Sequence, residues 1–393
     1  MIQAPAEPGL FRRGKIFRAG ISIFVASNVL LPNWTDCEAT TLNEMQQTLR
    51  ATWMAEPAAA RRNTAVQAIG GFLRSLRGRH DWPGSTEKRA WIAAKYLVRC
   101  LTMPRKQSEF LSLIESEPML HALRRRDPRM LERHFHRYIN RNWSRGQRLN
   151  AIQQHYVHAL HAMPAPLFRA VYAEGSAPLG MLTMKDDSRL VLSLHPPIFM
   201  GCEGELCIQL GDELGNPLYR VVVTVIARDT LAIGCIQGPV GSEARETVRE
   251  LTRNLHGLRP RCLMLALVGT LARHWGLSKL FAVGNAAHPL RNPRRRFVAD
   301  YDTYWEEQQG RAAADGWYEL PLQPKRKTEA DVPSQHRSAF RKREALRMEA
   351  ECLLVDALGK MLERHHQYEQ HAAGTSFNQP LQEPCAVASC TSR

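Results

Sequence analysis

The segment from residue 164 to residue 237 constrains the fold most, because it has the pattern of consecutive β-strands joined by short turns. Polar and apolar residues alternate in Arg189 to His195 and again in Glu205 to Leu210. The loop Gly211 to Pro217 is rich in glycine, asparagine and proline, as hairpin connections are. Leu218 to Ala227 carries valine on both faces, which is typical of a central strand. Sequential strands with short turns predict an antiparallel meander.

A glycine-bearing turn, Gln237 to Ser242, follows the meander and leads into two expected helices. The first covers Glu243 to Leu255. The second, Pro260 to Trp275, is apolar nearly all round, so we expect it to be buried. Further strands are expected at Lys279 to Gly284 and at Trp317 to Leu320. The predicted fold class is α/β, a mostly antiparallel sheet with packed helices, preceded by a helical layer.

Helical sequence flanks this core on both sides. We divide the chain into a variable helical N-terminal extension (1–85), a helical layer (86–163), the α/β core (164–322), a charged C-terminal helix (323–370) and a disordered tail (371–393). Within the helical layer, Asp127-Pro128 is typical of a helix start, and Ser144 with Gln147 is typical of a capping box.

The charge balance favours an anionic partner. The chain has 53 Lys and Arg against 38 Asp and Glu, which gives a formal net charge of +15. We expect a polyanion as the partner, either a lipid of the lipid A type, another anionic lipid, or RNA. The alternative is a solvated basic surface that keeps the protein soluble.

The cysteines and the hydropathy pattern bear on location and metal binding. None of the nine cysteines forms a C-x-x-C pair and several lie in apolar runs, so we expect a reducing compartment and no bound metal. No apolar run reaches the length of about 18 residues that a membrane-spanning helix needs. We expect a cytoplasmic protein, with peripheral attachment to the inner membrane as a second placement. A basic stretch before Ala19 to Leu31 resembles a signal peptide, which keeps secretion as an alternative.

Arginine recurs at four-residue spacing at Arg129, Arg133 and Arg137. On a helix that begins at Asp127 and continues to about Asn140, this spacing places the three guanidinium groups along one ridge. Arginine forks suit phosphate and carboxylate, so we predict an anion-binding ridge. The alternative is a solvated helix face with internal ion pairs.

The following helix carries three histidines, His155, His158 and His161. Apolar residues at helical spacing between Leu149 and Met163 predict a buried stripe, and the histidines fall on the opposite face. We expect that face to be solvated. The three rings spread too far around the helix for one metal ion to bind all of them.

The loop after the expected strand Lys279 to Gly284 concentrates side chains that carry chemistry. His288 is a candidate for proton transfer near neutral pH, with Asp300 or Asp302 to orient its ring. Three consecutive arginines are candidates for binding an anionic group: Arg294, Arg295 and Arg296. Two alternatives are a loop whose acids pair with its arginines, and aspartates that cap the next helix.

Several motifs occur in a fixed order along the chain. They are Arg148-x6-His155-Tyr156, the strands near 189–195 and 218–226, Phe281-Ala-Val-Gly-Asn285 with His288, Asp300-Tyr301-Asp302 with Trp305 and Glu306, and the segment Asp315 to Pro321. Together they resemble the VirK/YbjX family of Gram-negative bacteria over roughly residues 85 to 365. The resemblance implies a contribution to virulence and envelope phenotypes, including tolerance of cationic peptides. It implies no particular reaction.

The order of meander, glycine turn, helix, strand and polar loop is similar to the acyl-CoA N-acyltransferase fold. In that fold the turn opens a helix whose N-terminal amides hold the CoA pyrophosphate, because unpaired N–H groups attract an anion. The matching residues are Gln237, Gly238, Gly241 and Ser242, and the implied cofactor is an acyl-CoA. Val240 stands where that turn usually has its first glycine, and two helices precede the next strand in place of one.

Two functions of different classes follow. The first is an enzyme of acyltransferase type that acts on an envelope precursor, a polyamine or another amine. The second is a non-catalytic basic protein that binds RNA or anionic lipid and influences envelope composition. The sequence contains no G-x-S-x-G elbow, P-loop or H-E-x-x-H motif, so the corresponding hydrolase, nucleotidase and metalloprotease classes have no support.

Overall fold

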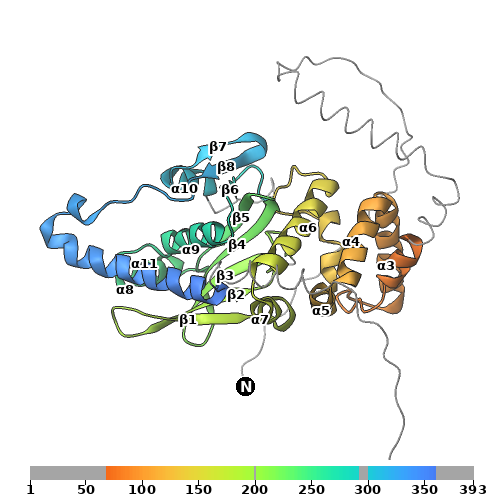
Figure 1. Ribbon diagram of the computed structural model, residues 1–393, viewed down its shortest axis with the longest axis horizontal. Coiled ribbons are helices and arrows are strands. Elements are labelled where there is room, and N and C mark those ends of the chain that lie inside the picture. Colours follow the sequence, from red (N-terminus) through yellow and green to blue (C-terminus); the bar gives the residue numbers. More distant parts are fainter. Residues whose placement is uncertain (1–67, 199–200, 292–299, 360–393) are drawn as a thin grey trace, which may run out of the picture. The chain divides into compact units, whose positions relative to one another are not determined.

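Figure 1 shows the computed structural model, which describes residues 68–198, 201–291 and 300–359. The predicted extension up to residue 67 and the predicted tail 371–393 lie outside these ranges. The main feature is an eight-stranded sheet with the strand order β1-β2-β3-β4-β5-β6-β8-β7. The strands are β1 (Ala177–Thr183), β2 (Arg189–His195), β3 (Leu206–Gly211), β4 (Pro217–Ala227), β5 (Thr230–Gln237), β6 (Lys279–Val283), β7 (Arg311–Ala312) and β8 (Trp317–Leu320).

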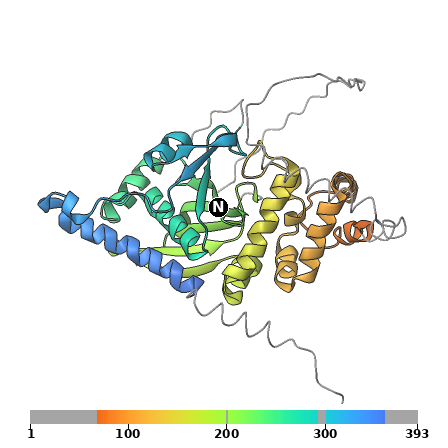
Figure 2. The same ribbon diagram turned by 45° about the horizontal axis from the view of Figure 1, so that its top comes forward.

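Strands β1 to β5 form the predicted antiparallel meander, each paired with the next. Three consecutive valines of β4, Val221, Val222 and Val223, are completely buried. Successive strand residues point to opposite faces, so both faces of β4 are covered, as expected from the valine-rich pattern. Helices α6 (Arg145–Ala162) and α9 (Pro260–His274) both pack against β4. Figure 2 shows them, in yellow and teal, beside the green strands.

The second half of the sheet contains a parallel pair. Strand β6 lies parallel to β5, and β8 then pairs antiparallel with β6. Helices α8 (Ala244–Asn254) and α9 connect β5 to β6, since parallel neighbours need a long crossover connection. The fold is therefore mixed α/β with a mostly antiparallel sheet, as predicted.

The remaining helices lie before and after the sheet in the chain. They are α3 (Thr86–Leu101), α4 (Pro104–Ser116), α5 (Pro118–Arg126), α7 (Ala165–Phe168), α10 (Tyr301–Glu307) and α11 (Arg337–Leu358), with short 3₁₀ or π segments η1 (Pro128–Leu131), η2 (Arg133–Phe135), η3 (Arg169–Glu174), η5 (Ala314–Gly316), η6 (Glu329–Asp331) and η7 (Ser334–His336). The predicted capping box at Ser144 and Gln147 is present at the start of α6.

The predicted continuous helix over 127–140 is wrong. Asp127 does cap a first turn, but the chain forms two short 3₁₀ turns that are separated at Glu132. The buried carboxylate of Glu132 accepts hydrogen bonds from Arg79 at 2.6 Å and from the indole of Trp82 at 3.1 Å. These tertiary bonds hold Glu132 in a non-helical conformation, which helix propensity in the sequence does not reveal.

The predicted solvated position of His155 is also wrong, because this side chain is completely buried, whereas His161 is exposed. Strand β3 begins opposite Val223, so the amide of Val225 has no partner on β3. Nδ1 of His155 accepts a hydrogen bond from that amide at 3.2 Å, and Nε2 lies 2.7 Å from the hydroxyl of Tyr172. A backbone amide can only donate, so Nδ1 carries no proton and the ring is neutral.

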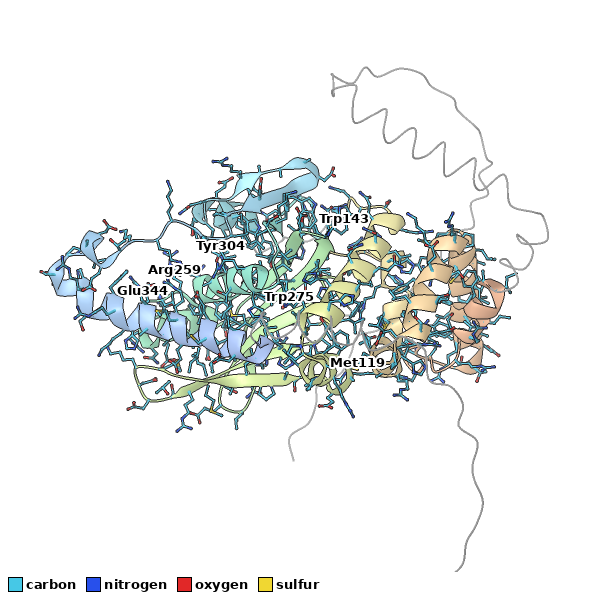
Figure 3. All side chains as sticks on the ribbon, in the orientation of Figure 1. Met119, Trp143, Arg259, Trp275, Tyr304 and Glu344 are labelled. Carbon is cyan, nitrogen blue, oxygen red and sulfur yellow. The ribbon has the colours of Figure 1, made fainter. Side chains whose placement is uncertain are left out.

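Helix α9 is buried, as predicted from its apolar composition, with Leu267 completely inaccessible to solvent. The ring of Trp275 at its end lies 5.2 Å from the ring of His158 on α6 (Figure 3). Helix α11 packs against α9 and β1 through residues at helical spacing, among them Leu346, Ala350 and Leu354. Within the described ranges, no helix combines the length and apolar character that a membrane span requires.

Acidification should destabilise the protein through His155, whose pKa burial lowers to about 3. The unfolded chain binds a proton near pH 6.5 and the folded chain does not, so stability is complete above that pH and falls as the pH drops from 6.5 toward 3. Between pH 7 and pH 5 the loss from His155 is about 2 kcal/mol. Urea unfolding at both pH values measures it.

The matched variants are His155→Gln, which can still accept from Val225, and His161→Gln at the exposed end of the same helix. The first should be less sensitive to pH than the wild type, and the second should retain the wild-type sensitivity. Equal sensitivity in all three proteins would contradict the assignment.

Candidate functional site

The carboxyl ends of β5 and β6 bring together two regions that the sequence analysis treats separately. The parallel ladder pairs Thr230–Ile233 with Lys279–Ala282, and β5 then continues to Gln237 without further pairing to β6. The turn at 238–242 leaves the end of β5, and the loop that carries His288 leaves the end of β6. Both regions therefore start from the same edge of the sheet, where α/β proteins commonly bind ligands.

A buried carboxylate, Glu203, joins the two regions. Its Oε2 accepts a hydrogen bond from Nε2 of Gln237 at 2.8 Å, and its Oε1 lies 3.4 Å from Nε2 of His288. Glu203 is only 1% exposed. The sequence analysis missed Glu203, because it stands before β3 and far from both motifs in the chain. The one sequence signal is two acids, Glu203 and Glu205, within three positions of a buried strand.

Glycine in β5 allows Glu203 to lie where it does. A Cβ atom on Gly234 would be 1.8 Å from the carbonyl oxygen of Glu203, a distance that no side chain allows. The same segment is held on its other side by Ile139, whose amide donates to the carbonyl of Cys202 at 2.7 Å. A glycine inside a strand often marks such a close approach of a second backbone.

His288 is buried, with 2% exposure. Its ring stacks on Tyr301, with centroids 5.3 Å apart, and its Nδ1 accepts from the amide of Leu290 at 3.2 Å. Nδ1 is therefore unprotonated, and the proton of the neutral ring lies on Nε2, which faces Glu203. The hydroxyl of Tyr301 donates to the carbonyl of Ile236 at 3.2 Å, which places this ring against the end of β5 that does not pair with β6.

The two aspartates anchor the loop, and the carboxylate beside His288 is that of Glu203. Asp300 is the N-cap of α10 and accepts from Thr303 N at 3.2 Å and from Asn285 Nδ2 at 3.0 Å. Hydrogen bonds from Thr303 and then Asn285 lower the pKa of Asp300. Asp302 accepts a hydrogen bond from the backbone N–H of Asn285 at 2.7 Å. These contacts agree with the capping alternative, and they do not support the expected orientation of His288 by an aspartate.

Two thiols line the same region and are unsuited to nucleophilic attack. Burial, and then the charge of Glu203, raise the pKa of Cys202 to about 11. The same causes raise the pKa of Cys235 well above its usual value. Both remain protonated near neutral pH, so neither is an activated nucleophile. Within the described ranges, no group of His, Cys, Asp and Glu has the arrangement of a metal site.

The two glycines of the turn after β5 stand at positions where a side chain would be strained or would clash. Gly241 has a φ of +105°, and a Cβ on Gly238 would lie 2.8 Å from the ring of Tyr219. Ser242 is exposed. Helix α8 follows with Glu243 at its N-cap, and no side chain caps its first amides. The amide of Ala244 donates to the carbonyl of Gly241 at 3.4 Å, and Glu243 adds negative charge at this helix start.

The structure does not form the predicted arginine ridge. Arg133 is buried and contacts the carboxylates of Glu205 and Asp127, because two short 3₁₀ turns separated at Glu132 replace the helix on which the ridge depends. Arg137 is exposed and Arg129 is half-buried. Their role in anion binding stays a prediction.

The other predicted anion-binding group, Arg294, Arg295 and Arg296, lies outside the described residues.

A second buried polar cluster surrounds Glu205. Tyr156 of α6 donates to Oε2 of Glu205 at 2.5 Å, and Arg133 contacts the same oxygen. The amide of Glu205 donates to Oγ1 of Thr224 at 3.0 Å. This cluster links η2 and α6 to the start of β3, and its acid is neutralised by Arg133. Its role is structural, since one buried charge offsets the other.

Comparison with known proteins gives the family. A family described as "Protein of unknown function (DUF535)" matches residues 85–351 of this chain. The chain belongs to the DUF535 family. The DUF535 match contains β1 to β8, and with them Glu203, Gly234 and His288.

Relatives of this DUF535 protein occur in several bacteria. The uncharacterized protein YbjX of Escherichia coli K12 is 30% identical over 287 residues, which is 71% of this chain and 87% of YbjX. An uncharacterized protein of Haemophilus influenzae is 28% identical over 236 residues, covering 58% of this chain and 73% of that protein. The membrane protein LapB of Mannheimia haemolytica is 26% identical over 192 residues, covering 48% of this chain and 81% of LapB.

Replacing the β5 glycine tests whether this site depends on a close backbone approach. Gly234→Ala should lower the free energy of unfolding by about 3 kcal/mol, since overpacking a rigid core typically costs 1–3 kcal/mol and here the added Cβ would collide with a backbone carbonyl. Gly70→Ala, where an added Cβ finds its nearest atom at 3.4 Å, is the control and should change stability little. Urea denaturation compares them. Equal stabilities would mean that the 201–205 segment moves away from β5 without cost.

Proposed function

We propose that this DUF535 protein is an acyltransferase that takes its acyl group from a CoA thioester and transfers it to an amine. The observation that carries the proposal is the parting of β5 and β6 after Ile233 and Ala282, with the Glu203–His288 pair at that point. The sheet order, with a parallel pair after an antiparallel meander, is similar to the acyl-CoA N-acyltransferase architecture.

The end of β5 that does not pair with β6 supports binding of a thioester carrier. The pantetheine arm of CoA is a narrow chain with two amides, and such a chain can pair with a strand edge through main-chain hydrogen bonds. The carbonyl of Ile236 is an acceptor on this edge, now engaged by the hydroxyl of Tyr301. A ligand amide can replace that hydroxyl as the donor. The pyrophosphate would then reach the turn at 238–242 and the first amides of α8.

The Glu203–His288 pair supplies a proton acceptor for the transfer step. The amine nitrogen attacks the thioester carbonyl, the carbon–sulfur bond breaks, and the proton of the amine passes to the pair. The CoA thiolate leaves and is protonated. Gln237 fixes the second oxygen of Glu203, so the carboxylate is held in one orientation. General base assistance of this kind typically contributes a factor of about 100 or more.

The proposed acceptor is an amine of an envelope precursor or a polyamine, and the proposed location is the cytoplasm, including the inner surface of the membrane. The net charge of +15 supports attraction to anionic lipid or to a lipid A-type precursor. The relative from Mannheimia haemolytica is named a membrane protein, which agrees with work at a membrane surface.

Ligand binding and turnover test the proposal separately. CoA and acetyl-CoA should raise the melting temperature, since a ligand at 100 times its dissociation constant stabilises the native state by about 2.7 kcal/mol. With spermidine as the amine, Glu203→Gln should retain this shift and lower the rate of thiol release about 100-fold or more. Glu250→Gln, on the exposed face of α8, is the charge-matched control and should keep the wild-type rate. No shift with either thioester or free CoA would contradict the proposal.

A second candidate function is polyanion binding without catalysis, and a basic hollow favours it. Four arginines, Arg74, Arg77, Arg124 and Arg125, line an open depression of about 460 Å³ together with Glu115. Arg74 pairs with Glu115, and Arg124 donates to the carbonyl oxygens of Arg74 and Arg77. Arg77 and Arg125 are exposed and remain available to bind phosphate groups.

Heparin chromatography tests this second function. The Arg77→Gln, Arg125→Gln double variant should elute at lower salt and reduce the slope of log affinity against log salt by about two, since each phosphate contact contributes close to one. Arg249→Gln, Arg253→Gln on α8 removes the same charge elsewhere and is the control. An equal loss in both variants would assign the effect to net charge and exclude the hollow as the site.

A further inference from the structure

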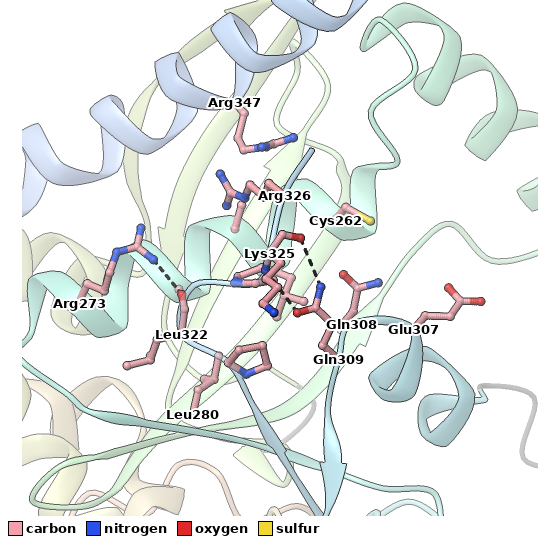
Figure 4. A pocket seen from close by; sticks show the side chains of 15 residues that line it. Cys262, Arg273, Leu280, Glu307, Gln308, Gln309, Leu322, Lys325, Arg326 and Arg347 are labelled. Atoms are coloured by element: carbon pink, nitrogen blue, oxygen red, sulfur yellow. Dashed lines mark hydrogen bonds between the residues drawn. The ribbon is translucent and has the colours of Figure 1, made fainter. Parts of the chain in front are cut away.

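A separate cavity lies on another part of the molecule, between α9, the end of α10, α11 and the 321–326 segment that follows β8 (Figure 4). Its volume is about 230 Å³. A cavity of about 150 Å³ is enough to hold benzene, so this one accommodates a small ring or a short chain with a polar group attached. It shares no residue with the Glu203–His288 site.

The floor of the cavity is apolar. Leu265, Ala266 and Gly269 of α9 line it, together with Leu280 of β6 and Leu322 after β8. An apolar floor favours a ligand with an apolar body, because removing such surface from water stabilises the complex. The floor is built on buried elements of the core, so its shape is fixed before any ligand binds.

The rim of the cavity is strongly basic. Arg273, Lys325, Arg326 and Arg347 line it, against the single acid Glu307. Figure 4 shows Arg347, Arg326 and Lys325 one below another, with Arg273 to one side. Four cations and one carboxylate give the lining a net charge of +3, so the rim attracts an anion.

The neighbouring carboxylates compensate only part of this charge. Glu344 forms two bonds to Arg347, at 2.6 and 2.8 Å, and Glu351 lies 3.6 Å from Arg326. Within the described ranges, neither Arg273 nor Lys325 takes part in an ion pair with a carboxylate.

The hydrogen bonds of these two residues are to uncharged groups and leave their charge available. Arg273 donates to the carbonyl of Leu322 at 2.9 Å and to Oγ1 of Thr270 at 2.9 Å. Lys325 is held through its backbone, which exchanges two hydrogen bonds of 3.3 Å with the side chain of Gln309. Its ammonium group therefore keeps its donors for a ligand.

The electrostatics of Arg347 show that the cations are crowded. Burial, and then the charge of Arg326, lower the pKa of Arg347, even though Glu344 acts in the opposite direction. The guanidinium groups of Arg326 and Arg347 are thus held close enough to repel each other. An anion between them would relieve this repulsion and gain charge-assisted hydrogen bonds.

We propose that this cavity is a binding site for a small amphipathic oxyanion, namely a phosphate or carboxylate group on a short apolar body. The oxyanion lies at Lys325 and Arg326, and the apolar body lies against Leu265, Ala266 and Leu280. This inference is independent of the acyltransferase proposal, because it rests on different residues.

Four probes of matched shape test the chemistry by calorimetric titration. Phenyl phosphate and benzoate carry an oxyanion and a ring, benzamide carries the ring without charge, and inorganic phosphate carries charge without the ring. At least one of the first two should bind, and the stronger of them identifies the headgroup. That probe should exceed both benzamide and inorganic phosphate in affinity by about tenfold, since a charge-assisted hydrogen bond or a buried ring each contributes enough for that factor. If inorganic phosphate bound as tightly as the better probe, surface charge alone would account for binding. That result would overturn the proposed site.

Variants locate the bound probe. Lys325→Gln and Arg326→Gln should each weaken binding of the better probe about tenfold, whereas Lys327→Gln, which removes the same charge from a residue outside the lining, should leave binding unchanged. Ala266→Leu fills the floor without altering charge and should also abolish binding, with folding checked by the melting temperature. Unchanged binding in Lys325→Gln and Ala266→Leu, or the same loss in Lys327→Gln, would overturn the proposal.

Discussion

The close passage of the 201–205 segment over β5 is the contact on which the proposed site depends. Gly234 makes it possible, because any side chain there would collide with the carbonyl of Glu203. The passage carries Glu203 to the place where β5 and β6 stop pairing, and there it meets Gln237 from β5 and His288 from the loop after β6. Three segments that are far apart in the chain thus converge on one carboxylate.

Two buried acids, Glu203 and Glu205, precede β3 and have different partners. The partners distinguish a structural role from a proposed chemical role. Glu205 faces Arg133, so its charge is neutralised and its position is fixed. Glu203 faces an amide and an imidazole, neither of which carries a permanent charge. The carboxylate of Glu203 therefore has no fixed cation beside it, whereas that of Glu205 does. This contrast supports the proposal that the Glu203–His288 pair, and not Glu205, takes part in proton transfer.

The sequence predicts those features that local pattern decides. Alternation at 189–195 and the valine-rich 218–227 segment predict the meander, and the apolar 260–275 segment predicts a buried helix, because burial of these elements follows directly from their periodicity. Features decided by distant partners are missed. The helix over 127–140 is interrupted because Glu132 binds Arg79, and His155 is buried because the Val225 amide has no β3 partner. His288 could be chosen from the sequence as a site residue, but its partner Glu203 lies 85 positions away and follows no motif.

Hydrogen–deuterium exchange with and without CoA reports where a ligand pairs with the backbone. It therefore tests whether a thioester carrier lies along the end of β5 that does not pair with β6 and reaches the turn before α8. Added CoA should slow exchange in peptides that cover 234–247 and leave peptides from α3 to α5 unchanged. Slower exchange confined to α3–α5 or to the 321–326 segment, or no change anywhere at saturating CoA, would contradict this placement of the carrier.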